Sequence, residues 1–199
     1  MAAHSAYRGI DMEITAGILR GMTLLSPESS APVRPTSVRA RQAFFDSLGD
    51  LSGLVFADLC AGSGAMGLEA ASRGASEICF AEKDPKSLHV IHRNIAKAEK
   101  RIPDIQYSII EGTLPDSCKR LVRTTEPDII FADPPYAESA ELLTALCSDA
   151  DFTGWARGGK LFWEFPPDGC SPLKPPPSPW KISQIRTFGA VRFLILEVF

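Results

Sequence analysis

The tetrapeptide Asp133-Pro134-Pro135-Tyr136 follows the apolar run 129–132 and offers groups that could hold a polar, planar substrate. One interpretation is purely structural, because prolines end strands in many proteins. The other is chemical, since a carboxylate, a backbone carbonyl on a rigid turn and an aromatic ring occur together. The choice between the two depends on what the rest of the chain places beside this turn.

A glycine-rich loop lies earlier in the chain. Gly62, Gly64 and Gly67 have G-x-G-x-x-G spacing at the start of a predicted helix. Glycines let the backbone turn tightly and approach a ligand, and a helix N-terminus offers free N–H groups. Asp58 stands just before the loop, and Glu82 ends the next predicted strand, 20 residues beyond Gly62. Because an acid at that second position accepts hydrogen bonds from ribose hydroxyls, the pattern indicates a nucleoside-containing cofactor.

Two cofactors fit this loop, a dinucleotide and S-adenosylmethionine. A dinucleotide places its pyrophosphate against the glycines, where Asp58 would repel it. The same carboxylate tolerates the ammonium group of a methionine moiety, so the charge favours S-adenosylmethionine. We interpret Cys60, inside the loop, as a packing residue rather than a nucleophile. The expected cofactor-binding residues of this region are Asp58, Cys60, Ala61, Gly62, Ser63, Gly64, Gly67 and Glu82.

The elements that must position these residues alternate along the chain. Short apolar runs alternate with helical patterns from residue 54 onward, which predicts βαβ units and a mostly parallel sheet. The last two runs are joined by a turn around Gly189 and predict an antiparallel hairpin. The predicted strands are 54–59, 77–82, 107–110, 128–133, 160–165, 180–188 and 190–199. The predicted helices end near 73, cover 85–100, begin weakly at 115 and lie near 139–146.

We interpret residues 1–53 as an N-terminal extension and residues 54–199 as a single globular unit. Within the extension, residues 12–27 predict a short hairpin and residues 34–48 a helix. The proline-rich segment 166–179 cannot be a helix or a central strand, because proline removes backbone donors. A ligand for a partner domain is one interpretation of this segment, and a surface connection is favoured over it.

The predicted sheet order explains what the turn at Asp133 could do. In a doubly wound sheet, strand 128–133 lies beside strand 54–59, so both the turn and the glycine loop open on one crevice. The exocyclic amine of a nucleobase is a poor nucleophile, because its lone pair is delocalised into the ring. The Asp133 carboxylate and the Pro134 carbonyl can hold its N–H groups and shift the nitrogen toward sp³. Pro135 adds rigidity, and Tyr136 offers a face for a flipped-out base.

Composition sets limits on partners and ligands. The chain has 199 residues, a net charge of −3 and a pI of about 5.7. Proteins that bind nucleic acid over a broad surface are usually basic, so such a partner requires a local patch or help from another macromolecule. Five scattered cysteines and the pair His89 and His92 suggest neither a disulfide framework nor a metal site. No apolar run reaches the roughly 20 residues of a membrane span and no signal peptide is evident, so we expect a cytoplasmic protein.

Four segments together resemble a known family. They read DLCAGSGAMGLEAASRGA, AEKD, FADPPY and AGILRGMTL…RPTSVRARQAFF. In combination they are similar to the bacterial 16S ribosomal RNA guanine-N2 methyltransferases of the RsmD type, over nearly the whole chain from about Met12. The resemblance implies a Rossmann-like class I methyltransferase fold with seven strands and helices on both faces. It also implies S-adenosylmethionine as donor, a guanine in small-subunit ribosomal RNA as acceptor, and an assembled or assembling ribosomal particle as partner. Lys83, Gly112 and Thr113 join the expected cofactor contacts on this basis. Separately, we expect a monomer that holds no metal.

The chain departs from the family pattern at three places. Cys60 stands where the family commonly has phenylalanine, and Thr113 where it has an acid that meets the adenine amine. Thr113 or Glu111 is a candidate substitute for that acid. The segment RPTSVRARQ also lacks an Asp and a Glu near the helix start. Adenine N6, a protein glutamine amide and a non-catalytic RNA-binding role remain as alternative functions.

The arginines of the N-terminal helix are expected to have different roles. At about 100° per residue, Arg39 and Arg41 point roughly 200° apart. The apolar side of this helix is formed by Val38, Phe44, Phe45 and Leu48, and Arg41 falls within it. Since burying an unpaired arginine is costly, we expect Arg41 to meet a carboxylate or the active-site cleft. Arg34 and Arg39 are candidate RNA contacts, although a solvated surface charge is an equal alternative for Arg39.

Overall fold

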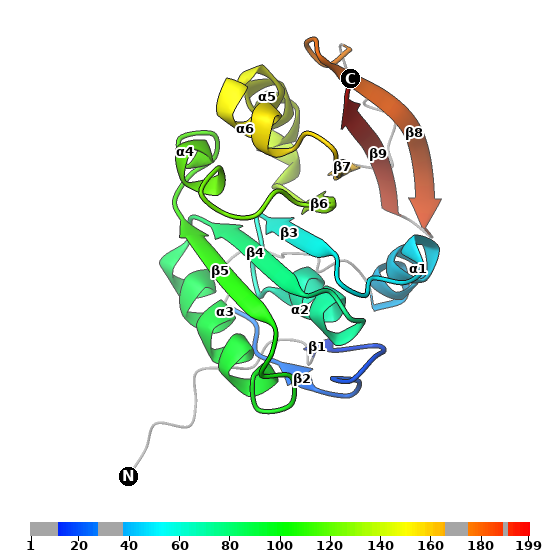
Figure 1. Ribbon diagram of the computed structural model, residues 1–199, viewed down its shortest axis with the longest axis vertical. Coiled ribbons are helices and arrows are strands. Elements are labelled where there is room, and N and C mark those ends of the chain that lie inside the picture. The colour runs from blue at the N-terminus through cyan, green and yellow to red at the C-terminus, as the bar shows by residue number, and fades with distance from the viewer. Residues whose placement is uncertain (1–11, 28–37, 166–174, 189–190) are drawn as a thin grey trace.

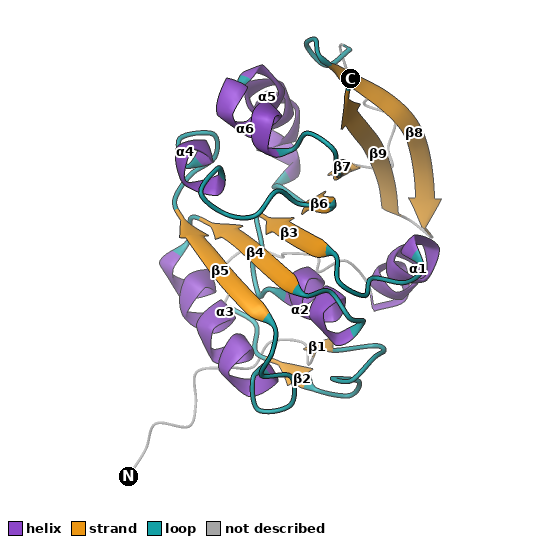
Figure 2. Ribbon diagram, in the orientation of Figure 1, coloured by secondary structure: helices purple, strands orange, loops and turns teal. Residues whose placement is uncertain are grey.

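The main sheet has seven strands and runs through the middle of the molecule (Figures 1 and 2). The computed structural model describes residues 12–27, 38–165, 175–188 and 191–199. The strands are β3 (Val55–Leu59), β4 (Glu77–Glu82), β5 (Gln106–Glu111), β6 (Ile129–Ala132), β7 (Lys160–Phe165), β8 (Trp180–Phe188) and β9 (Val191–Val198). Their order is β5-β4-β3-β6-β7-β9-β8. The expected α/β fold with a seven-stranded, mostly parallel sheet is confirmed.

The directions of the strands explain where a ligand site forms. Strands β3 to β7 are parallel, whereas β9 is antiparallel to both β7 and β8. Because β4 and β6 flank β3 on opposite sides, the strand order reverses at β3 and β6, where open α/β sheets bind ligands. We refer to the edge at which strands β3 to β7 end as the carboxyl edge. The predicted placement of β6 beside β3 is confirmed.

Helices cover both faces of the sheet, as expected. One face carries α1 (Val38–Leu48), α2 (Ala65–Ser72) and α3 (Pro85–Ala98), and the other carries α4 (Cys118–Leu121), α5 (Tyr136–Ser148) and α6 (Ala150–Trp155). The buried strands read as continuous apolar runs because both of their faces are covered. Phe44 of α1 lies at the centre of one core, with its ring centroid 5.2–5.4 Å from those of Phe131, Phe162 and Phe193.

The N-terminal hairpin packs against α2 and α3. Strands β1 (Met12–Glu13) and β2 (Thr23–Leu24) pair antiparallel, as predicted for residues 12–27. The backbone between them is held by side chains of the larger unit, such as Ser72, whose hydroxyl accepts a hydrogen bond from Leu19 N at 2.9 Å. The division of the chain at residue 53 remains a prediction.

Two details differ from the sequence expectations. Helix α6 follows α5 after Asp149, which caps α6 by accepting a hydrogen bond from Phe152 N, and no separate helix was expected there. Val38, expected on the apolar side of α1, is 47% exposed because it begins the helix, before the first turn reaches the core. Arg34, the turn at Gly189 and residues 166–174 of the proline-rich segment lie outside the described residues.

Candidate functional site

The glycine loop is held by hydrogen bonds from its own backbone. Gly62 has a φ of 55°, a left-handed conformation that glycine adopts without strain. Its N–H donates to Glu82 Oε2 at 2.7 Å, and the N–H of Gly64 donates to the Ala61 carbonyl at 2.8 Å. Within the described part of the chain, the N–H of Ser63 donates no hydrogen bond. The loop therefore presents a backbone donor at its tip.

Gly67 supports the loop from inside the protein. It lies in α2, and a Cβ atom added there would come within 2.4 Å of the Phe80 ring on β4. This position thus requires glycine for the close packing of α2 on the sheet. Its N–H donates to Asp58 Oδ2 at 3.0 Å, which satisfies one of the unpaired donors at the start of the helix. The structure places Gly67 as a packing residue beneath the expected cofactor contacts.

Asp58 is a buried acid at the end of β3, with 2% of its surface exposed. Burial raises the pKa of its carboxyl group well above the usual range, and the hydrogen bond from Gly67 opposes this shift. The negative charges of Glu82 and Asp133 raise the pKa further. Three carboxyl groups from β4, β3 and the end of β6 therefore influence one another at the carboxyl edge, which makes this region favourable for a cation.

Glu82 fixes the backbone on both sides of this edge. Besides Gly62, its carboxylate accepts hydrogen bonds from Lys83 N at 2.8 Å and Asp84 N at 2.9 Å. Two carboxylate oxygens offer about four acceptor sites, so capacity remains for a ligand hydroxyl. The ammonium of Lys83 lies 3.0 Å from the carboxylate of Glu138, and this exposed ion pair joins the residue after β4 to the first turn of α5.

Cys60, at the start of the glycine loop, has a φ of 59° and is a non-glycine residue in the left-handed region. Burial raises the pKa of its thiol to about 12, and the negative charge of Glu82 adds to this effect. A thiol with such a pKa stays protonated at neutral pH and is a poor nucleophile. This agrees with its interpretation as a packing residue.

Asp116, which follows β5 closely, is an acid that the sequence analysis did not single out. Gly112 and Thr113 follow β5, and the hydroxyl of Thr113 donates to Asp116 Oδ2 at 3.1 Å. The structure therefore places an acid three residues after the position where the family resemblance implies one. Glu111, the other candidate substitute, is exposed at the last position of β5.

The turn after β6 lies beside the glycine loop. Leu59 of β3 and Ala132 of β6 are register partners, so Cys60 and Asp133 are the next residues on two adjacent strands. Pro134 is buried and Pro135 precedes α5, whose first residue is Tyr136. Tyr136 is 52% exposed, so part of this residue is accessible to a ligand. The structure brings together the predicted residues of β3, β4 and β6.

Arg41 is buried with a carboxylate, as its helix position predicts. It is 1% exposed, and its Nε lies 3.4 Å from Oε2 of Glu69, which is itself fully buried in α2. Burial lowers the pKa of Arg41, and the charge of Glu69 opposes this change. Arg39 is exposed on the opposite side of α1, as expected, and its role in RNA contact remains a prediction.

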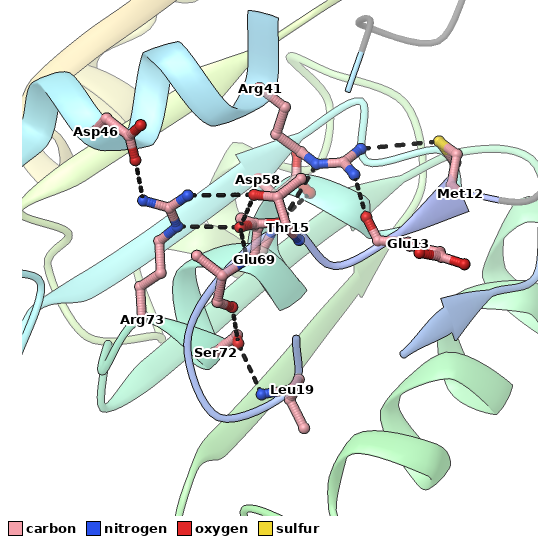
Figure 3. Close-up of polar contacts among 12 residues, drawn as sticks. Met12, Glu13, Thr15, Leu19, Arg41, Asp46, Asp58, Glu69, Ser72 and Arg73 are labelled. Atoms are coloured by element: carbon pink, nitrogen blue, oxygen red, sulfur yellow. Dashed lines mark hydrogen bonds and ion pairs between the residues drawn. The ribbon is translucent and has the colours of Figure 1, made fainter. Parts of the chain in front are cut away.

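Glu69 is the centre of a network that the sequence reading missed (Figure 3). Its Oε1 accepts a hydrogen bond from Arg73 Nε at 3.0 Å, and its Oε2 accepts one from Thr15 N at 2.8 Å. Arg73 also pairs with Asp46 of α1 at 2.8 Å. The network therefore joins α1 and the N-terminal hairpin to the helix that begins at the glycine loop.

Asn94 of α3 makes a second link that the sequence reading missed. It is fully buried, and its Nδ2 donates to the carbonyls of Ser63 and Leu25, each at 3.0 Å. Its Oδ1 accepts from Leu25 N at 2.9 Å. The Ser63–Gly64 peptide is thereby fixed from both sides, since Gly64 N already bonds to Ala61. Asn94 connects the glycine loop to the segment that follows β2.

Among the described residues, no group of three or more His, Cys, Asp or Glu side chains is arranged to hold a metal ion. No helix within these residues has the length and apolar character needed to cross a membrane.

The sheet order, the antiparallel hairpin and the glycine loop after β3 define a class I methyltransferase fold. A solved structure of a putative methyltransferase from Escherichia coli shares this fold, with a TM-score of 0.70 and 24% identity over 94% of this chain and 98% of that chain. Residues 12–194 match the family described as Conserved hypothetical protein 95, and the chain belongs to this family, which is of the RsmD type.

Two relatives have been given functional names. The ribosomal RNA small subunit methyltransferase D of Haemophilus influenzae is 28% identical over 193 residues, which cover 94% of each chain. A putative rRNA methyltransferase of Bacillus subtilis is 30% identical over 129 residues, which cover 64% of this chain and 68% of that protein.

Proposed function

We propose that this protein transfers a methyl group from S-adenosylmethionine to the exocyclic N2 amine of a guanine in small-subunit ribosomal RNA. The observation that carries the proposal is the register of β3 and β6. The pairing of Leu59 with Ala132 makes Cys60 and Asp133 the next residues on adjacent strands, so the glycine loop and the acceptor turn share one part of the carboxyl edge.

The residues at the carboxyl edge suit the proposed cofactor. S-Adenosylmethionine supplies an electrophilic methyl group on a positively charged sulfur. Glu82 and Asp133 provide negative charge there, and a ligand with ammonium and sulfonium groups also favours the charged form of the buried Asp58. The unpaired N–H of Ser63 is a donor for a carboxylate, and the remaining acceptor capacity of Glu82 suits ribose hydroxyls. Lys83, Gly112 and Thr113 complete the proposed contacts on the ribose and adenine side.

The acceptor turn is proposed to bind the guanine amine. The Asp133 carboxylate and the Pro134 carbonyl accept the amine N–H groups and localise the nitrogen lone pair toward the methyl donor. The buried Pro134 and the adjoining Pro135 restrict the turn, so little reorganisation accompanies the reaction. The exposed ring of Tyr136 stacks on the flipped-out base, which contributes about 1–3 kcal/mol in comparable aromatic–base contacts.

Ribosomal RNA is proposed as the acceptor because both relatives named above carry rRNA methyltransferase in their names. We propose that the substrate is a ribosomal particle, because the ribosomal proteins in the particle can supply contacts that an acidic enzyme lacks. We also propose that the enzyme is a monomer and acts in the cytoplasm. Arg39 is proposed as an RNA contact from the exposed side of α1, and Arg34 lies outside the described residues. Arg41 supports the site through Glu69 and α2.

An amine methyltransferase acting on adenine N6 or on a glutamine amide is the second candidate. The same turn presents acceptors for the N–H groups of any of these amines, so the geometry of Asp133 and Tyr136 is compatible with each. The candidates differ in the product. A non-catalytic relative would bind RNA and transfer no methyl group.

Labelled S-adenosylmethionine is incubated with the protein and, separately, with small ribosomal particles, bare ribosomal RNA, DNA and a glutamine-containing protein acceptor. The modified group is identified by mass spectrometry. We expect N2-methylguanosine in ribosomal RNA. N6-Methyladenosine or methylglutamine would support the second candidate, and the absence of label in every acceptor would refute the enzyme assignment.

A further inference from the structure

Helix α3 carries a row of basic side chains on one side. Lys86, His89, Arg93 and Lys97 follow one another at spacings of three or four residues, and Lys100 continues the row just beyond the helix. At about 100° per residue, these five positions fall within about 80° of one another. Lys97 is half-buried and the other four residues are exposed. We call these five residues the α3 basic row.

The row is a local excess of positive charge in an acidic protein. The chain has a net charge of −3, yet α3 contains no Asp or Glu. Of the acids that flank the helix, Asp84 accepts a hydrogen bond from Ser87 N at 2.9 Å and interacts electrostatically with Lys86, and Glu99 points about 120° away from the middle of the row. In the described part of the chain, Lys86, Lys97 and Lys100 form no ion pair.

Two helices on the other face of the sheet have the opposite charge pattern. Helix α5 carries Glu138 and Glu141 and contains no Lys or Arg, and α6 carries Asp151. The short helix α4 on that face is basic instead, with Lys119 and Arg120. An anionic partner is therefore attracted to the α3 side of the molecule and repelled from the α5 and α6 side. This asymmetry is hidden in the overall charge and the pI.

The row begins at the candidate active site. Helix α3 starts three residues after Glu82, so Lys86 lies near the carboxyl edge of the sheet. From there the row extends for about 21 Å along the helix, at about 1.5 Å per residue. Its far part lies against the N-terminal hairpin, where Lys97 Nζ donates to the Thr23 carbonyl at 3.3 Å (Figure 1). The row thus leads away from the site where the base would react.

We propose that the α3 basic row binds successive phosphates of the RNA strand on one side of the methylated nucleotide. This inference rests on the function proposed above. Lysine and arginine contacts to phosphate position a nucleic acid without reading its sequence. A base that leaves its stack to reach Asp133 needs its flanking backbone held, and a row that starts at the carboxyl edge meets this requirement.

The test compares two double variants with the same change in net charge. Lys86→Glu with Lys100→Glu reverses two members of the row. Arg157→Glu with Lys181→Glu reverses two exposed charges at the side of the sheet opposite the carboxyl edge, where β7 begins. Binding of a small-subunit ribosomal RNA fragment is measured over a range of salt concentrations, and the affinity for S-adenosylmethionine is measured for each protein.

We expect the row variant to bind RNA at least 10-fold more weakly than the control variant at low salt. The slope of log affinity against log salt should fall by about 1.4, since each contact to a single strand contributes about 0.7. Cofactor affinity should match that of the unchanged protein in both variants. The neutral pair Lys86→Gln with Lys100→Gln should show the same direction, and it serves as the test if charge reversal disturbs folding.

Two results would overturn the inference, and they differ in what they imply for the function. If the unchanged protein methylates ribosomal RNA but the row variants bind RNA like the control, the α3 basic row does not bind RNA and the proposed function stands. If the unchanged protein neither binds nor methylates RNA, both proposals fail.

Discussion

The Asp58 carboxyl group is buried beside two other acids and accepts a hydrogen bond from the backbone of α2. These surroundings raise its pKa in the folded protein above the ordinary value, so the folded state holds a proton that the unfolded state has lost. The ligand-free protein should therefore become less stable as the pH rises from the ordinary Asp range through the raised pKa.

Asp58→Asn should remove this dependence, because the amide keeps an acceptor for Gly67 N and carries no charge. We expect the variant to be at least as stable as the unchanged protein at neutral pH, with a flatter stability profile as the pH rises above the ordinary Asp pKa of about 3.9. Urea unfolding at several pH values measures this. A profile as steep as that of the unchanged protein would assign the pH dependence to another group.

In the ligand-free protein, the surroundings of Asp58 favour its protonated form. A bound cationic ligand favours the charged carboxylate instead. The affinity for S-adenosylmethionine should thus rise with pH in the same range, and this rise should be absent in Asp58→Asn. Calorimetry in buffers of different ionisation enthalpy should detect a proton released on binding. Equal pH profiles in the two proteins would contradict the role given to Asp58.

At the scale of elements, Glu69 joins α1, α2 and the N-terminal hairpin. Glu69→Gln leaves Arg41 as a buried, uncompensated charge, and removing one partner of a buried ion pair costs about 3–5 kcal/mol. We expect a loss of this size in the free energy of unfolding, measured with urea.

Asp46→Asn is the matched control for Glu69→Gln. It breaks the ion pair of Arg73 with a carboxylate that is 57% exposed, so the expected loss is below about 1 kcal/mol. Similar losses in the two variants would show that burial of the network adds nothing to stability.

Asn94 connects two other elements, the glycine loop and the segment after β2. Asn94→Leu leaves the carbonyl of Ser63 and both backbone groups of Leu25 without their partner, which costs about 1–3 kcal/mol per unsatisfied group. We expect weaker binding of S-adenosylmethionine in addition to lower stability. Ser72→Ala loosens the same N-terminal segment without touching the loop and should leave cofactor affinity unchanged.

If Asn94→Leu and Ser72→Ala change cofactor affinity equally, the link from Asn94 to Ser63 has no special role. A folded Asn94→Leu protein with unchanged cofactor affinity would lead to the same conclusion.

At the scale of the whole molecule, local patterns predicted the sheet because each buried strand is an apolar run that ends at a turn. The pairing of β6 with β3 was predicted from the topology of doubly wound sheets. The burial of Arg41 beside a carboxylate was predicted from helix geometry. Asn94 lies on the apolar side of α3 in the same way, so the argument used for Arg41 could have found it. Glu69 precedes Arg73 by four residues, a spacing that indicates a helical ion pair but says nothing of burial.

The partners of these buried groups depend on contacts between distant segments, which local periodicity does not encode. Glu69 meets Thr15 across 54 residues, and Asn94 meets Leu25 across 69. Helix α6 is six residues long, too short to give a clear period.

The central claim is that the turn at Asp133 is the acceptor site. The most direct measurement compares Asp133→Ala with Glu141→Ala, an exposed acid on the adjoining helix α5, for methyl transfer to ribosomal RNA and for S-adenosylmethionine binding. We expect Asp133→Ala to transfer methyl at least about 100-fold more slowly, the effect of removing one group that stabilises a transition state, while its cofactor affinity stays within a few-fold. Glu141→Ala should behave like the unchanged protein. Normal methylation by Asp133→Ala would contradict the account.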